Sequence, residues 1–494
     1  MISKTVRRML AVSLAAVMAV GSMAACGKDE GTTADPTKAP EKQDEQKEEV
    51  KQPEAEATAT PTPVPEAYVI RTDANGNTVD LGGMEVIIRD WWSSGDEPEP
   101  QNAYDEARKE YLDWIQSTYN FTIKMQAIGD WASVPGDFVN YASTGGDENY
   151  VFTVWQGTSI TAAMNSGLLY DLSKLDCLDF TEKKWVSGVH NLLSNKDGIY
   201  GMNANTPEPR AGIFFNKRLL KEAGVEPADL YKWQENGEWT WEKFQEVCEA
   251  VQRDVDNDGV VDIYGETSQR IQVYSAAVYS NGGEFVGKDE NGNYVNELES
   301  APTLEALNWG VDFINTYELP VSAEANWDYY VTAFREGKAA FCVDDAYRFN
   351  DFAEMEDDWG FVCFPKGPRA TDYTNCYQDN VLVIPACYGD EKAWKIAFAY
   401  NLYTNPIPGY EDYEGWQSGY MTKSKDIESV ELTLARMTKN GMITYHSMVP
   451  GIELGEDLLW TLGYPDANGE LATPAQRAEG LRNAWNTKIN EVNK

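Results

Sequence analysis

Along most of the chain, short apolar runs alternate with segments whose apolar residues recur every three or four positions. An apolar, β-branched-rich run bounded by polar residues or glycine predicts a buried strand. Four such runs occur, at residues 83–90, 121–125, 151–155 and 212–217. Strands separated by helical segments predict an α/β fold built around largely parallel sheets.

Two of the helical segments carry additional signals. Residues 104–115 place Tyr111, Ile115 and other apolar side chains on one face of a helix. A later helix is expected to start at Thr240, because threonine is a common N-cap residue, and Trp239 can then pack against Phe244. Each helix therefore has an apolar face to bury against a sheet.

The first 26 residues predict an export signal. Three basic side chains precede an apolar run over residues 9–20, which is too short to span a bilayer. The small residues that follow, up to Cys26, resemble a bacterial lipobox, with Met23 where leucine is usual. We therefore expect a lipoprotein signal peptide over residues 1–25 and lipidation of Cys26. A plain secretory signal with an incidental cysteine is the alternative.

Residues 26–80 are predicted to be a disordered linker that follows the lipid anchor. Proline, lysine and acidic residues dominate as far as residue 66, and no aromatic residue occurs between 27 and 66. Such a segment cannot bury enough apolar surface to offset the entropy lost on ordering. The folded part is expected from residue 81 onward, exported and tethered to the outer face of the cell membrane.

The composition allows a large core and disfavours several functions. Hydrophobic residues make up 42% of the 494 residues, and the net charge of −39 would repel nucleic acid. The two histidines, His190 and His446, disfavour histidine-based triads and zinc sites. The seven cysteines form no CxxC pair. Those in apolar runs are predicted to be buried free thiols, with disulfide bonds as the alternative. The 16 tryptophans and 27 tyrosines favour a surface that stacks on flat ligands.

Four stretches together resemble the extracellular solute-binding proteins of ABC importers, the class that includes maltose-binding protein. They are GIYG at 198–201, IFFNKRLL at 213–220 followed by EAG at 222–224, GEWTWEKF at 237–244, and AFREGKAAF at 333–341. Phe341 stands where the family usually has methionine. The order of these stretches carries the resemblance, and the lipobox supplies the expected delivery to the cell surface.

The resemblance implies an α/β, two-lobed periplasmic-binding-protein fold, type II-like, with hinge crossings and a helical C-terminal part. One lobe would comprise residues 81–208 and 366–408, and the other residues 209–365 and 409–494. The chain would cross near 206–212 and 362–368 and return near 405–410. A ligand in the cleft, closure by hinge motion and ABC permease subunits as partners are also implied. The protein is expected to be a monomer.

Candidate ligand-binding residues follow from the chemistry of sugars. Sugars present apolar C–H faces and rims of hydroxyls, which aromatic rings and carboxylates or amides can bind. The first candidate is Trp155, at a strand end where the resembled family places a stacking tryptophan. Trp91 and Trp92 follow the first strand at its carboxyl end, the side on which α/β sheets bind ligands. Core packing is the alternative role for each tryptophan.

Residues 341–347 correspond to a family segment that usually reads like NGPW. Tyr347 takes the aromatic place there, and Asp344 or Asp345 the polar place. An exposed acidic turn is the alternative for these residues. Further candidates stand before a later apolar run and in the C-terminal part: Gln378, Asp379, Asn380, Trp416, His446 and Trp460.

Residues 254–265 begin like an EF-hand calcium loop. Asp254, Asp256, Asp258 and Asp262 stand at loop positions 1, 3, 5 and 9, but Gly265 replaces the closing glutamate. The loop occurs once, which disfavours a calcium sensor. Some carbohydrate-binding members of the resembled family hold one calcium ion in such a loop, which implies a structural Ca²⁺ bound by these four side chains and the Val260 carbonyl. A solvated acidic turn is the alternative.

Together these features predict a substrate-binding lipoprotein of an ABC transporter that captures a carbohydrate, with no enzymatic activity and no organic cofactor. The acidic, aromatic-rich chain favours a neutral or cationic solute, with an oligosaccharide ahead of amino-sugar, polyol and peptide ligands. The alternative is a secreted glycoside hydrolase, which needs two carboxylates about 5–9 Å apart. No hydrolase motif, GxSxG elbow or Walker loop occurs. A surface polysaccharide-binding adhesin is a third possibility.

Overall fold

The computed structural model describes the globular part of the chain and excludes the N-terminal segment. The residues described are 68–95, 99–155, 157–185, 193–195, 198–204, 208–322, 324–378, 380–411, 413, 415–439, 441–465 and 471–494. The predicted signal peptide, Cys26 and the linker as far as residue 67 lie outside them. The chain divides into two units, of which the larger comprises residues 70–407 and 414–494 and the smaller residues 1–69 and 408–413. Every sheet described below belongs to the larger unit.

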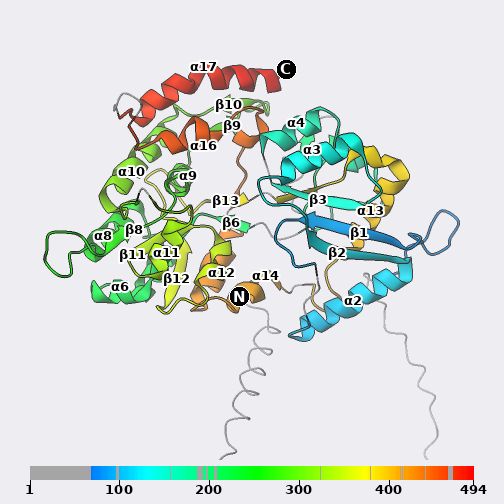
Figure 1. Cartoon of the computed structure of the whole chain (residues 1–494), viewed down its shortest axis with the longest axis horizontal. Coiled ribbons are helices and arrows are strands. Elements are labelled where there is room, and N and C mark those ends of the chain that lie inside the picture. The colour runs from blue at the N-terminus through cyan, green and yellow to red at the C-terminus, as the bar shows by residue number, and fades with distance from the viewer. Residues whose placement is uncertain are drawn as a thin grey trace, which may run out of the picture. The chain divides into compact units, whose positions relative to one another are not determined.

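The first sheet confirms three of the strands predicted from the sequence. Its strand order is β14-β3-β1-β2, with β1 (Met84–Asp90) parallel to both β2 (Phe121–Ala127) and β3 (Tyr150–Trp155) (Figure 1). The added strand β14 (Asn380–Val383) runs antiparallel to β3. The predicted amphipathic helix is α2 (Ala103–Tyr119), which buries Tyr111 and Ile115. Helix α13 (Gly389–Tyr403) packs against α2 and β2.

A second sheet contains the fourth predicted strand. Its order is β12-β7-β11-β8, formed by β7 (Gly212–Asn216), β8 (Tyr264–Glu266), β11 (Ala339–Asp344) and β12 (Trp359–Cys363). Every residue of β7, β11 and β12 is buried, which explains why these segments are continuous apolar runs. Strand β7 runs antiparallel to both β11 and β12, so the prediction of largely parallel sheets is wrong for this sheet. Helix α8 (Trp241–Val251) confirms the predicted start, because Thr240 caps it by accepting the Lys243 N–H at 3.3 Å. The Trp239 and Phe244 rings lie 5.5 Å apart, as expected.

A small third sheet joins segments that are far apart in the sequence. Strand β13 (Asn375–Gln378) pairs antiparallel with β6 (Glu208–Arg210) and parallel with β15 (Gly441–Met442). Strand β6 leads into β7 of the second sheet, and β13 leads into β14 of the first. The chain therefore passes between the two large sheets at β6, inside the expected range 206–212, and again at β13.

The second passage lies later in the sequence than the predicted crossing at 362–368. Lys366 exchanges backbone hydrogen bonds with Trp239 and Trp241, and the Gly367 N–H donates to the Ser280 carbonyl. These partners belong to the helices around the second sheet, so residues 366–367 stay with that sheet. The predicted boundaries of the two lobes remain a prediction elsewhere along the chain.

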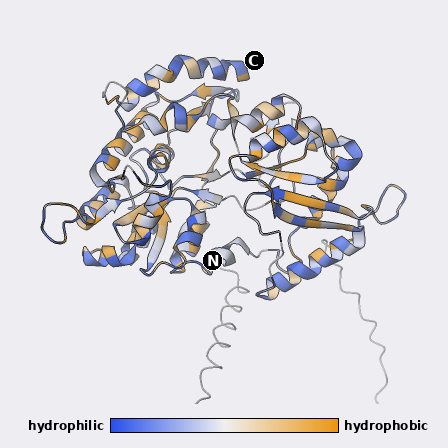
Figure 2. Cartoon of the chain, in the orientation of Figure 1, coloured by the Kyte–Doolittle hydropathy of each residue, from blue (hydrophilic) through white to orange (hydrophobic). Residues whose placement is uncertain are grey.

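Helices and short strands complete the described structure, and the C-terminal part is helical, as expected. The strands of the first sheet are largely hydrophobic, whereas α17 carries hydrophilic and hydrophobic positions in turn (Figure 2). Among the described residues, no helix combines the length and apolar character needed to cross a membrane. The remaining elements are α3 (Val134–Thr144), α4 (Thr158–Asn165), η2 (Leu172–Lys174), β4 (Ser194–Asn195), β5 (Gly198–Ile199), α6 (Lys217–Glu222), α7 (Pro227–Asn236), α9 (Arg270–Ser280), β9 (Val286–Lys288), β10 (Tyr294–Asn296), α10 (Ala301–Tyr317), α11 (Tyr329–Arg335), η3 (Ala346–Arg348), α12 (Phe349–Phe352), η4 (Ala386–Tyr388), α14 (Gly415–Met421), η5 (Ser429–Leu434), α15 (Ala435–Met437), η6 (His446–Met448), α16 (Leu454–Asp457), η7 (Leu459–Thr461) and α17 (Pro474–Val492).

Candidate ligand-binding site

A cavity of about 430 Å³ lies within the larger unit and is lined by residues from distant parts of the sequence. The segments that follow β2 and β3 contribute, as do the β6–β7 junction, one face of α9, β13 and residues 444–459. This volume falls within the usual range for small-molecule sites. We call it the main cavity. Its lining includes Trp131, Trp155, Gly157, Arg210, Ala211, Gln272, Asp345, His446 and Ser447.

Two stacked tryptophans form the apolar part of the main cavity. The rings of Trp131 and Trp155 lie 5.0 Å apart and are inclined by 17°, and the Trp155 Nε1–H donates to the Trp131 carbonyl at 2.9 Å. Trp131 is 54% exposed, so a large apolar surface remains available. Gly157 is required beside this pair, since a Cβ atom there would lie 2.3 Å from the Trp155 ring. The geometry gives a flat, pre-positioned surface for a ligand with an apolar face.

A charged network forms a polar part of the main cavity. The Arg210 guanidinium makes an ion pair with Asp345, whose carboxylate also accepts the Ala211 N–H at 3.0 Å and the Gln272 side-chain amide at 3.2 Å. Ala211 holds a left-handed backbone conformation, with φ of 60°, which is uncommon for alanine. The Tyr347 ring lies 5.3 Å from the Arg210 guanidinium. These contacts fix the carboxylate and the guanidinium in place as hydrogen-bonding groups.

His446 and Ser447 bring unsatisfied polar atoms to the main cavity. The His446 Nδ1 and the Ser447 Oγ are buried, and neither has a hydrogen-bond partner among the described residues. Burial lowers the pKa of His446 to about 4, so the imidazole is neutral at pH 7. A buried polar atom without a partner costs about 1–3 kcal/mol. Ligand hydroxyl groups could supply the missing partners once a movement of either side chain opens these atoms to the cavity.

Comparison with known proteins identifies the family. The sequence profile of the bacterial extracellular solute-binding proteins matches residues 122–400, which is more than half of the chain. The chain belongs to this family. No protein among the curated sequences matches it.

Solved structures of other proteins share the fold of this family member. The GacH receptor of Streptomyces glaucescens GLA.O, solved unliganded and with acarbose and an acarbose homolog, is 14% identical, with a TM-score of 0.54 over 82% of this chain and 99% of that one. The cyclic alpha-maltosyl-1,6-maltose binding protein of Arthrobacter globiformis is 13% identical, with a TM-score of 0.58 over 83% and 100%. UgpB of Mycobacterium tuberculosis, solved with glycerophosphocholine, is 17% identical, with a TM-score of 0.57 over 78% and 95%. The predicted two-lobed fold is confirmed.

Of the residues predicted to bind ligand, Trp155 and Asp345 line the main cavity of this solute-binding protein, as does the further candidate His446. The other candidates have different surroundings. Trp91 and Trp92 lie 4.7 Å apart, edge to face, with Trp91 packed against the core of the first sheet and Trp92 exposed. Trp416 packs against Tyr420 and the larger core.

Three other candidates, Asp344, Tyr347 and Asn380, contact residues that line the main cavity. Asp344 is buried and paired with Arg348 at 2.9 Å, and its burial raises the pKa of the carboxyl group. Tyr347 lies 4.9 Å from the Arg348 guanidinium, in addition to its contact with Arg210. Asn380 pairs with Trp155 across β14 and β3, so it helps to hold the end of the strand that carries this tryptophan. Asp379 lies outside the described residues.

Several lining residues were not predicted from the sequence. Trp131 stands four residues after β2, so the rule that pointed to Trp91 after β1 could also have found it. Arg210 and Gln272 gave no such signal, because a polar residue at a strand end or on an amphipathic helix is normally solvated. Ser447 follows His446, and its role depends on the cavity around it.

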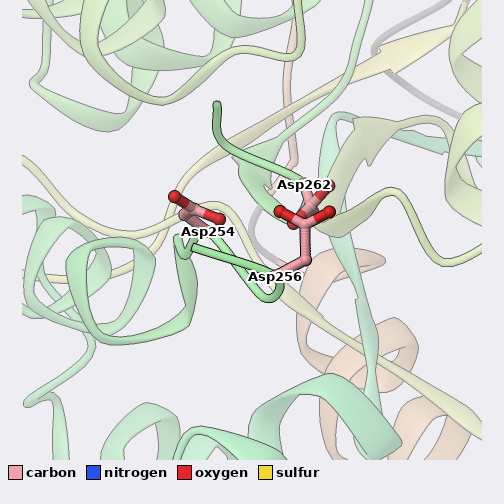
Figure 3. Close-up of side chains that lie close together, drawn as sticks. All are labelled: Asp254, Asp256 and Asp262. Atoms are coloured by element: carbon pink, nitrogen blue, oxygen red, sulfur yellow. The ribbon is translucent and has the colours of Figure 1, made fainter. Parts of the chain in front are cut away.

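The acidic loop after α8 brings three carboxylates together. One oxygen from each of Asp254, Asp256 and Asp262 lies within 4.8 Å of the others, and the Asp256 side chain reaches toward Asp262 (Figure 3). The Gly259 N–H donates to Asp254 at 2.7 Å and lowers the pKa of that carboxyl group. Asp258 instead accepts the Val260 N–H at 2.8 Å. Carboxylate oxygens grouped in an exposed loop fit Ca²⁺, which these residues could hold.

Proposed function

We propose that the protein captures an oligosaccharide in the main cavity and delivers it to an ABC permease. The observation that carries the proposal is the pairing of a stacked tryptophan surface with buried polar atoms that lack partners, at His446 and Ser447. The tryptophans would cover the C–H face of a sugar ring. Sugar hydroxyls, which both donate and accept, would complete the hydrogen bonds of the imidazole and the serine.

The names of the similar structures support the same ligand class. The GacH receptor was solved with acarbose, and the Arthrobacter globiformis protein is named for a cyclic maltosyl-maltose. A further structure, CpMnBP1, was solved with mannotriose, with a TM-score of 0.53. The complex of UgpB with glycerophosphocholine makes a small polar solute the second candidate ligand class.

A binding titration tests the proposal. The exported protein is titrated calorimetrically with linear malto-, cello-, xylo- and manno-oligosaccharides and with glycerophosphocholine, and the products are analysed for cleavage. We expect one oligosaccharide series to bind without turnover. Saturation at 100 times the Kd would stabilise the protein by about 2.7 kcal/mol, which a thermal shift detects. Binding of glycerophosphocholine alone, or cleavage of the sugars, would contradict the proposal.

Trp155→Ala and Trp394→Ala form a matched pair for this titration. The Trp394 ring stacks on Phe398 at 5.0 Å and 15°, and its Nε1–H donates to Asp176 at 2.6 Å, so its surroundings copy those of Trp155 outside the cavity. Removing Trp155 should weaken oligosaccharide binding roughly tenfold or more. Removing Trp394 should lower stability and leave the Kd unchanged. Equal effects on the Kd would exclude a direct role for Trp155.

Membrane attachment through Cys26 is part of the same proposal and rests on the lipobox sequence. Lipidation would keep the protein beside the permease that receives the sugar. A Cys26→Ser variant should leave the cell surface and appear in the medium. Retention of this variant at the membrane would refute lipidation at Cys26.

A further inference from the structure

A second cavity, of about 260 Å³, lies at the N-terminal end of α9, and four of its nine lining residues are aromatic. Trp327, Tyr329, Trp460 and Tyr464 contribute the rings. Trp327 is 65% exposed and Tyr464 is 45% exposed. Large aromatic side chains grouped at an exposed site mark a binding surface, because each leaves apolar area in contact with water. We call this the outer cavity.

The rings of the outer cavity are held by contacts beneath them. Trp327 and Trp460 lie 5.4 Å apart, inclined by 59°. The Arg270 guanidinium lies 4.3 Å from the centre of the Tyr464 ring and is itself paired with Glu318 at 2.6 Å. The surface is therefore positioned before a ligand arrives, which reduces the entropy lost on binding.

One residue that lines the outer cavity carries an unsatisfied hydrogen-bond donor. Gln269 is only 8% exposed, and its side-chain nitrogen is buried with no acceptor among the described residues. A ligand hydroxyl is a suitable acceptor. Flat rings together with amide and guanidinium donors suit a sugar unit, which has both a C–H face and hydroxyls.

The two cavities share their walls. Arg270 lines the outer cavity and the next residue, Ile271, lines the main one. Leu459 lines the main cavity and Trp460 the outer one. A Cβ atom on Gly455, another residue of the main cavity, would lie 2.9 Å from the Trp460 Nε1. Residues 270–271 and 459–460 therefore lie between the two cavities, with neighbouring residues lining different cavities.

We propose that the outer cavity is a second subsite for the same carbohydrate, so that the ligand is a chain longer than the main cavity alone can hold. This inference rests on the proposed function. One end of the chain would occupy the main cavity, beside Trp155. The sugar units that leave it would contact Trp460 and Trp327 and accept a hydrogen bond from Gln269.

A chain-length series tests the second subsite. Malto-, cello-, xylo- and manno-oligosaccharides are titrated from disaccharide to octasaccharide against the wild type, Trp327→Ala, Trp460→Ala and Ile427→Ala. Ile427 is the control, because its exposed apolar side chain lines neither cavity. We expect affinity to rise with length in the wild type. The two tryptophan variants should bind the long oligosaccharides with roughly tenfold lower affinity and keep the wild-type Kd for the shortest oligosaccharide that binds.

The outcomes separate the second subsite from the proposed function. Failure of every oligosaccharide to bind the wild type would overturn both. Binding that is independent of length, or equal losses for short and long chains, would overturn the second subsite alone. Loss of permease-dependent uptake by a Trp327→Ala variant with an unchanged Kd for every chain length would also overturn it, in favour of a protein partner at this surface. Circular dichroism of each variant confirms folding, and Trp327→Ser gives a second, more soluble replacement of the most exposed ring.

Discussion

Replacing His446 by glutamine tests whether a neutral, buried imidazole sets the acid stability of the protein. Burial lowers the pKa of His446 from 6.5 to about 4. Between pH 6.5 and about 4, His446 is therefore protonated in the unfolded chain and neutral in the folded protein. Because the unfolded chain binds more protons, acidification favours unfolding. The stability contributed by the neutral ring is present above pH 6.5 and is lost as the pH falls through about 4.

The size of the effect follows from the size of the pKa change. One pKa unit corresponds to 1.36 kcal/mol, so the loss relative to neutral pH is about 2 kcal/mol at pH 5 and about 3 kcal/mol at pH 4. Carboxyl groups also titrate in this range, so the wild type alone cannot isolate the histidine. The difference between the wild type and His446→Gln at each pH does so.

The assay is urea-induced unfolding at pH 7, 6, 5 and 4, followed by both tryptophan fluorescence and circular dichroism. Coincident transitions for the two signals are required before a free energy of unfolding is extracted. We expect the wild type to lose about 3 kcal/mol more than His446→Gln between pH 7 and pH 4. Ser447→Ala is the control and should keep the wild-type pH dependence, because it removes no titratable group. Parallel pH curves for the wild type and His446→Gln would refute the reasoning.

Three further predictions concern other sites. Gly157→Ala should weaken ligand binding and lower stability by about 1–3 kcal/mol, because the new methyl group would lie 2.3 Å from the Trp155 ring. Gly136→Ala, which meets no atom within 4 Å, is its control, and equal melting temperatures would contradict the prediction. A chelator should lower the melting temperature and Ca²⁺ should restore it, except in Asp254→Asn; a melting temperature unaffected by chelator and calcium would exclude a structural ion. Burial raises the pKa of Glu266 well above its usual value, so its stabilising contribution is present at acidic pH and lost as the pH rises. The unfolding free energy of Glu266→Gln minus that of the wild type should therefore increase between pH 4.5 and 8. A decrease in this difference would rule out a buried protonated carboxyl group.

Sequence reasoning predicted the features whose causes are local. Apolar runs gave three strands of the first sheet, β1, β2 and β3, and one of the second, β7, since a strand buried on both faces must be apolar along its length. Thr240 and Trp239 signalled the start of α8 because capping depends on residues within one helical turn. Trp155 was predicted because the resembled family places a stacking tryptophan at the end of this strand, and β3 does end at Trp155.

The rest of the candidate site depends on contacts between distant segments. Arg210 pairs with Asp345, and Asp345 also accepts a hydrogen bond from Gln272, across intervals that no local pattern encodes. Trp91 and Trp155 both end strands of one sheet, yet Trp91 packs against the core while Trp155 stacks on Trp131. Which aromatic residue faces a ligand is decided by the neighbours that tertiary structure supplies.

The small third sheet makes the main cavity depend on segments that lie late in the sequence. Strand β15 and the cavity residues from Thr444 to Leu459 lie after both large sheets in the sequence. Their partners, such as β13 and α9, precede them by many residues, and such long-range contacts form late. A chain still passing through the export channel, or one cut before residue 441, would carry both large sheets and lack a wall of the main cavity. A complete main cavity is therefore expected only when these late segments have folded against β13 and α9.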